Sequence, residues 1–130
     1  MRVSEKHRSR LWLEEQGFVV EDCERWVRGA NRTQDLLGFA DLMALRFNEP
    51  PMLVQVTSAS NHAARRTKIL DEPRAALAAF IGFDLYVHSW KAPSKQKPDW
   101  RMRREKLTLL DFRPEVTAVH LPTPRPGATA

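Results

Sequence analysis

The sequence predicts a single α/β domain in which helices pack on a mixed β-sheet. The chain has 130 residues, which is the length of one domain. Its composition, 42% hydrophobic and 28% charged, is ordinary for a globular protein. Short strand-like runs alternate with helix-like segments, an order typical of a sheet covered by helices. Neither an internal repeat nor a second domain is visible.

The first third of the chain predicts one helix and the start of the sheet. Residues 3–16 have helical spacing, with Ser4 as a cap and Gly17 as the end. Phe18-Val19-Val20 predicts a strand, which residues 24–28 could continue. Residues 29–38 are polar and flanked by glycines, so we expect a loop there.

A β-hairpin is expected next. The run from residue 39 to 47 is largely apolar, and the strand MLVQVT follows at 52–57. Between them, Asn48-Glu49-Pro50-Pro51 has the residue types of a turn.

The second half predicts helix followed by strands. Residues 60–82 have helical composition, and Pro73 either splits this segment or starts a second helix at its first turn. Residues 83–90 predict a strand, and residues 100–112 a weaker one. The proline-rich residues 113–130 predict a disordered or loosely packed tail, so the folded domain is expected to be 1–112.

Positive charge is concentrated rather than spread. The net charge is +5, and residues 88–106 alone contain seven cations and two carboxylates. Trp90 and Trp100 are interleaved with these cations, a pattern typical of nucleic-acid binding, although a solvated basic face would look the same. The predicted DNA-binding residues are Arg8, Arg10, Arg65, Arg66, Lys91, Lys95, Lys97, Arg101, Arg103 and Arg104.

Asp41 is a carboxylate inside an apolar run, where an unpaired charge is costly. Gln55 and Thr57 share one face of the following strand. If the loop spans 47–51, Asp41 lies opposite Thr57 and Met43 opposite Gln55, which clusters the polar side chains on one face; a four-residue loop would reverse this. Oxygen ligands from Asp41, the Gln55 side chain and the Val56 carbonyl would suit Mg²⁺, which can activate water.

These segments resemble the core of the PD-(D/E)XK nucleases. The resemblance rests on Gly38-Phe39-Ala40-Asp41, on Gln55-Val56-Thr57 and on the opening helix with Glu5, and it covers roughly residues 3–90. It implies a restriction-endonuclease-like fold, a mixed central sheet flanked by helices. Within the superfamily the chain is most similar to small Holliday-junction resolvases and to phage replication-repair nucleases of the VRR type. Those are Mg²⁺-dependent phosphodiesterases, and the resolvases work as homodimers.

The resemblance also implies roles for individual residues. Asp41 would be the core metal ligand, Gln55 stands in the position of the second carboxylate, and Glu5 resembles the acidic residue of the resolvase helix. Two departures are visible: Gln55 is neutral, and Thr57 occupies the position of the family's lysine. The helix that follows could bring Lys68 back as the replacement, with Arg65 and Arg66 as alternatives. Asp35 is a further possible ligand.

The expected function is therefore a structure-selective DNA endonuclease that uses Mg²⁺, with Mn²⁺ as a substitute, on branched or junction DNA as a homodimer. Two alternatives remain at this point: a DNA-binding module with an inactive site, and a basic structural or assembly protein. The single cysteine, Cys23, excludes an internal disulfide and a cysteine-rich zinc site. With neither a membrane-spanning run nor a signal peptide, we expect a cytoplasmic protein, in the host cytoplasm if phage-encoded, and no membrane partner.

Overall fold

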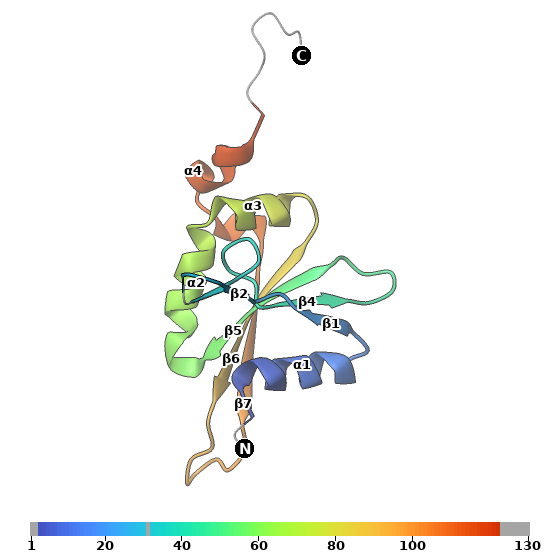
Figure 1. The fold of residues 1–130 in the computed structure, drawn as a ribbon, viewed down its shortest axis with the longest axis vertical. Coiled ribbons are helices and arrows are strands. Elements are labelled where there is room, and N and C mark those ends of the chain that lie inside the picture. Colours follow the sequence, from blue (N-terminus) through green and yellow to red (C-terminus); the bar gives the residue numbers. More distant parts are fainter. Residues whose placement is uncertain (1–2, 31, 123–130) are drawn as a thin grey trace, which may run out of the picture.

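A mixed five-stranded sheet forms the centre of the molecule, with helices packed on it (Figure 1). The computed structural model describes residues 3–30 and 32–122. The elements, in chain order, are α1 (Glu5–Glu15), β1 (Val19–Asp22), β2 (Arg25–Val27), β3 (Arg32–Gln34), β4 (Leu42–Leu45), β5 (Met52–Ser58), α2 (His62–Leu70), α3 (Pro73–Phe80), β6 (Asp84–Lys91), β7 (Arg101–Leu107) and α4 (Pro114–Thr117), with short 3-10 turns at Ala59–Asn61, Leu109–Asp111 and Ala118–His120.

The strand order of the sheet is β1-β4-β5-β6-β7. β5 and β6 are parallel, whereas the other neighbouring pairs are antiparallel. α2 and α3 form the crossover that the parallel pair requires. In the main sheet, α1 is followed by three strands (β1, β4 and β5), then by α2 and α3, and then by β6 and β7, which confirms the predicted α/β fold. The mixed sheet flanked by helices is consistent with a restriction-endonuclease-like layout.

Two hydrophobic clusters cover the two faces of the sheet. One contains Leu13 of α1 with Leu42 and Val54, and the other contains Ile69 of α2 with Leu53. Leu53 and Val54 are adjacent in β5 and belong to different clusters, because successive strand residues point to opposite faces. A strand buried on both faces explains why β5 begins with three consecutive apolar residues, 52–54.

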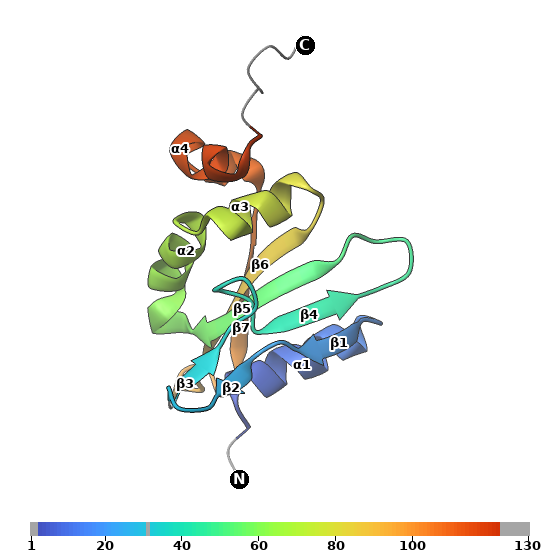
Figure 2. The same cartoon turned by 45° about the horizontal axis from the view of Figure 1, so that its top comes forward.

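Several predicted elements are confirmed with small changes of boundary. The Ser4 Oγ atom caps α1 by accepting the His7 N–H, and Pro73 starts α3 at its first turn. Residues 24–28 do not continue β1, and residues 29–38 are not wholly loop. Instead β2 and β3 pair as a separate two-stranded hairpin (Figure 2).

The register of the β4–β5 hairpin differs from the predicted one by two residues. Leu42 pairs with Val54 and Met43 with Leu53, and the Asp41 N–H donates to the Val54 carbonyl at 2.8 Å. Asp41 therefore lies level with Gln55 rather than Thr57, because the turn is longer than residues 47–51. A shift of two residues keeps every side chain on its predicted face, so Asp41 and Gln55 still meet.

The tail does not begin at residue 113. α4 packs close to α3, and Val116 is only 7% exposed within the hydrophobic core. Pro114 at the first turn favours a helix here, and that helix carries the apolar Val116 into the core. Residues 123–130 of the predicted tail lie outside the described part of the chain. Among the residues that are described, no helix is both long and apolar enough to cross a bilayer.

Candidate functional site

Asp41 and Gln55 form the centre of a polar site at one end of β4 and β5. The Asp41 Oδ2 atom accepts hydrogen bonds from the Val56 backbone N–H at 2.7 Å and from the Gln55 Nε2 at 2.9 Å. Both side chains are buried, Asp41 at 6% and Gln55 at 2% exposure. These bonds fix the orientation of the carboxylate without supplying any positive charge.

Two further carboxylates converge on Asp41. Glu24 precedes β2, Asp35 follows β3, and one oxygen of each lies within 4.8 Å of the others and of an Asp41 oxygen. The prediction of Asp35 as an extra ligand agrees with this position. Glu24 was missed, because nothing in the sequence shows that the hairpin after β1 folds back to the start of β4.

Burial, together with the neighbouring negative charge, makes Asp41 a much weaker acid. Burial raises the pKa of Asp41, as do the charges of Asp35 and Glu24 and a hydrogen bond with the Asp35 carboxyl, while the Val56 N–H acts in the opposite direction. The result is a pKa of about 8 instead of 3.8. Without a cation the cluster therefore holds a proton near neutral pH.

A buried oxygen without a partner completes the donor set. The Oε1 atom of Gln55 has no hydrogen-bond partner among the described residues, although its side chain is almost fully buried and lines the same cavity as Asp41. Leaving a buried acceptor unsatisfied costs free energy. A hard cation fits this set, because such ions prefer carboxylate and amide oxygens. The Val56 carbonyl, which Gln55 Nε2 approaches at 3.4 Å, is the remaining predicted ligand.

Two cations also line this cavity, which has a volume of about 350 Å³. Lys68 and Arg65 of α2 line it, and the Lys68 Nζ is 3.8 Å from an Asp35 oxygen. α2 thus places a lysine in the cavity, as predicted. Thr57 is buried and is not among the residues that line the cavity.

Glu5 is not brought to the carboxylates. It lines a separate cavity with Ser58, Trp90 and Trp100. The adjacent residue, Lys6, points toward the site instead, with its Nζ 3.1 Å from a Glu24 oxygen. Consecutive helix residues point about 100° apart, so one step along α1 decides which charge faces the site. The role predicted for Glu5 is not supported by this geometry.

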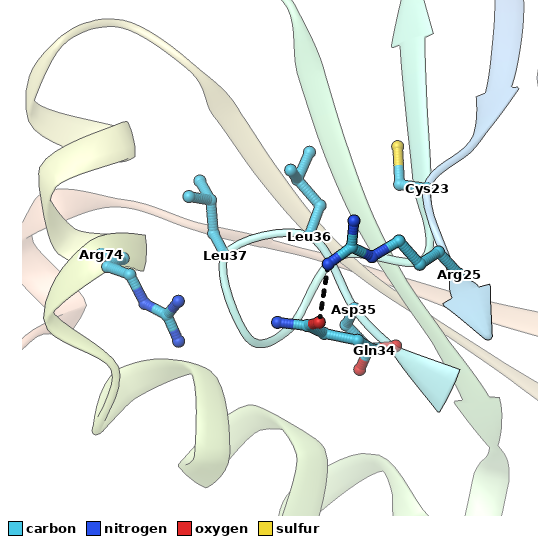
Figure 3. A pocket seen from close by; sticks show the side chains of 7 residues that line it. All are labelled: Cys23, Arg25, Gln34, Asp35, Leu36, Leu37 and Arg74. Atoms are coloured by element: carbon cyan, nitrogen blue, oxygen red, sulfur yellow. Dashed lines mark hydrogen bonds between the residues drawn. The ribbon is translucent and has the colours of Figure 1, made fainter. Parts of the chain in front are cut away.

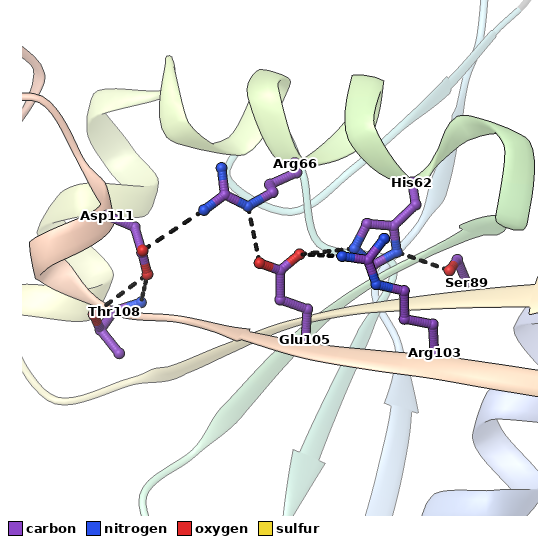
Figure 4. Close-up of polar contacts among 7 residues, drawn as sticks. All are labelled: His62, Arg66, Ser89, Arg103, Glu105, Thr108 and Asp111. Atoms are coloured by element: carbon purple, nitrogen blue, oxygen red, sulfur yellow. Dashed lines mark hydrogen bonds and ion pairs between the residues drawn. The ribbon is translucent and has the colours of Figure 1, made fainter.

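Some cations predicted to bind DNA have structural roles. Arg66 pairs with Glu105 at 2.9 Å, and Glu105 also accepts a bond from His62 at 2.8 Å (Figure 4). Although burial opposes it, these hydrogen bonds lower the pKa of Glu105. Arg104 stacks on the Tyr86 ring at 3.6 Å and donates to His88. These side chains join α2 to β7 and β7 to β6.

Other predicted contacts remain at the surface. Lys91, Lys95 and Lys97 are exposed at or after the end of β6, and Arg103 is exposed on β7. Arg101 is half-buried, with its Nε atom lacking a partner among the described residues. Arg8 stacks on the Trp100 ring at 4.0 Å, and Arg10 pairs with Glu14.

A second cavity, of about 260 Å³, adjoins the carboxylate site and shares Asp35 with it. It is lined by Cys23, Arg25, Gln34, Asp35, Leu36, Leu37 and Arg74 (Figure 3). The Arg25 guanidinium donates to the Gln34 side chain at 3.3 Å, whereas Arg74 is held by Glu72. Gly38, with φ of +79°, closes the turn below; a Cβ there would lie 2.5 Å from Arg74 Nη2.

Comparison with known proteins yields no relative. No protein-family model, curated protein or solved structure matches this chain. What this protein does is therefore inferred from the residues and geometry of its site.

Proposed function

We propose that this protein is a divalent-metal-dependent endonuclease that hydrolyses phosphodiester bonds in branched DNA, in the manner of a Holliday-junction resolvase. The observation that carries the proposal is one polar cavity lined by Asp41, by Gln55 and by the cations Lys68 and Arg65. Its Gln55 oxygen has no partner within the described part of the chain. Carboxylate and amide oxygens that share a cavity with cations are what a metal-assisted reaction of a phosphate requires.

Mg²⁺ or Mn²⁺ would be held by Asp41, the Gln55 oxygen and the Val56 carbonyl, with Glu24 and Asp35 close enough to join them. A bound cation offsets negative charge on the phosphate and makes water a better nucleophile near neutral pH. Two features favour such an ion: the raised pKa of Asp41 and the unsatisfied Gln55 oxygen. The raised pKa reflects burial and neighbouring negative charge, and the Gln55 oxygen lacks a donor, so a bound cation would relieve both.

The remaining residues would position the phosphate. Lys68 stands where its ammonium group can stabilise the charge that develops on the phosphate, in place of the lysine absent at Thr57. Arg65 can hold a phosphate oxygen by a charge-assisted hydrogen bond. The exposed cations Lys91, Lys95 and Arg103 would bind the backbone of a DNA arm farther away. A homodimer that makes two cuts remains a prediction.

The test compares a four-way junction, a flap and a linear duplex, each with Mg²⁺, Mn²⁺ or EDTA. We expect cutting of branched DNA with either metal, none in EDTA and none by Asp41→Asn. The matched control is Asp84→Asn, which removes a partly buried carboxylate that pairs with Lys106 away from the cavity and should keep cleavage. Salt-sensitive binding without any cutting would instead support the DNA-binding module with an inactive site.

A further inference from the structure

The β2–β3 hairpin carries an exposed tryptophan beside the carboxylate cavity. The Trp26 side chain is 58% exposed, an unusual position for so large an apolar ring. In the antiparallel register Trp26 lies opposite Thr33, and residues directly opposite share one face of a hairpin. Thr33 lines the cavity that contains Asp41, so the ring stands on the face that borders this cavity.

The same hairpin is strongly basic. Arg25, Arg28 and Arg32 lie within eight residues, and none of them forms an ion pair with a carboxylate of residues 3–30 or 32–122. Uncompensated guanidinium groups attract phosphate and bind it through paired hydrogen bonds. An exposed ring among such cations is the combination that binds a single nucleic-acid strand: the ring stacks on a base, and the cations attract the phosphates.

Both ends of the hairpin contribute to the carboxylate cluster. Glu24 directly precedes β2, and Asp35 directly follows β3. A strand whose phosphate occupies the cavity must therefore lie against the base of the hairpin. Because Trp26 pairs with Thr33, which lines the cavity, we expect the nucleotide next to that phosphate to lie nearest the Trp26 ring.

We propose that Trp26 stacks on an unpaired nucleobase next to the phosphate in the cavity, while the hairpin arginines hold the adjoining backbone. This inference rests on the proposed nuclease function and names its substrate class, DNA with unpaired bases at a branch. A base inside a duplex has both faces covered by its neighbours, whereas an unpaired base offers a free face to the ring. The hairpin thus accounts for a preference for branches without base-specific contacts.

The experiment measures binding, not cutting, so that it is independent of catalysis. The parent is Asp41→Asn, in which the DNA stays intact. The probes are a splayed DNA with 2-aminopurine as its branch-point base and a fully paired duplex of the same sequence. In this parent we compare Trp26→Ala, Trp26→Phe and the control Phe47→Ala, which removes a 90% exposed ring from the turn between β4 and β5.

We expect the parent and Phe47→Ala to prefer the splayed DNA and to quench the 2-aminopurine fluorescence. Trp26→Ala should bind this DNA about tenfold more weakly, which is the size of one lost base stack, and lose the quenching. Trp26→Phe should keep most of both, and binding to the duplex should change little. Equal binding and equal quenching in Trp26→Ala overturn this inference but leave the proposed nuclease function intact. Failure of the parent to bind either DNA overturns both.

Discussion

Replacement of Asp41 by asparagine tests the electrostatics of the site without DNA. The pKa of Asp41 is raised from 3.8 to about 8, so the folded protein holds a proton that the unfolded chain releases at lower pH. Stability from this group is therefore lost as the pH rises from about 4 through 8. Asparagine has nearly the same shape and can still accept the Val56 N–H, but it does not titrate.

The useful pH window follows from a second buried group. Burial, and then the charge of Arg104, lower the pKa of His88 to about 3, so the unfolded chain takes up a proton below about 6.5 that the folded protein refuses. His88 therefore removes stability as the pH falls, opposite to Asp41, and the two effects overlap between about 4 and 6.5. Above 6.5 His88 is neutral in both states, which leaves the contribution of Asp41 visible.

The expected magnitude follows from this window. Between pH 6.5 and the pKa of about 8 there are about 1.5 units, and each corresponds to about 1.36 kcal/mol. In EDTA the wild-type protein should lose about 2 kcal/mol more than Asp41→Asn between pH 6.5 and 8.5. Urea unfolding at several pH values, with both proteins side by side, gives this difference directly.

A divalent cation should remove the effect. Mn²⁺ supplies the charge that the proton otherwise supplies, so it should stabilise the wild-type protein by about 2.7 kcal/mol at a hundredfold excess over its dissociation constant. The stabilisation should be larger at pH 8 than at pH 6, because ionised ligands are already present, and it should be small in Asp41→Asn. Parallel pH profiles of the two proteins in EDTA, or equal stabilisation by Mn²⁺, would refute the reasoning.

Three further predictions concern single side chains. Lys68→Ala should lower the rate of cleavage by about 10²–10³ while the stability to urea stays unchanged, because the exposed ion pair of Lys68 contributes little. Lys68→Arg should recover part of the rate. An unaltered rate in Lys68→Ala would exclude a role of Lys68 in cleavage. Gln55→Glu should tighten Mn²⁺ binding in a calorimetric titration but destabilise the metal-free protein. The reason is that a second carboxylate would replace the amide that lies 2.9 Å from the Asp41 carboxylate. Weaker Mn²⁺ binding would count against Gln55 as a ligand. Ser9→Ala should destabilise the protein by about 2–3 kcal/mol in urea unfolding, because the buried Ser9 hydroxyl accepts the Trp90 N–H at 2.8 Å and bonds the His88 ring at 3.0 Å. A loss of stability below about 0.5 kcal/mol would show that other groups replace these hydrogen bonds.

The proximity of Asp41 and Gln55 could be predicted because it depends only on whether the hairpin register shifts by an even or an odd number of residues. Side chains alternate along a strand, so any hairpin register that differs by an even number of residues leaves both on one face. The predicted register was two residues away from the observed one and still placed them together. The exact partner of Asp41 could not be predicted, since the length of the turn depends on how Arg46 and Glu49 close it at 2.6 Å.

The roles of the cations could not be read from the sequence. Arg65 and Arg66 are adjacent and chemically identical, yet one lines the cavity and the other binds Glu105. Glu5 and Lys6 differ in the same way, because one helix step turns a side chain by about 100°. A count of charges cannot distinguish neighbours whose directions depend on how a helix packs.

The sequence by itself determined the sheet, its two covered faces and the central carboxylate, because these depend on local periodicity and the cost of burying a charge. Only the tertiary structure decided that Glu24 and Asp35 join Asp41. They are separated from it by 17 and 6 residues along the chain, and the excursion of the β2–β3 hairpin brings them back. Such convergence depends on the path of the backbone in space, which leaves no periodic pattern in the sequence.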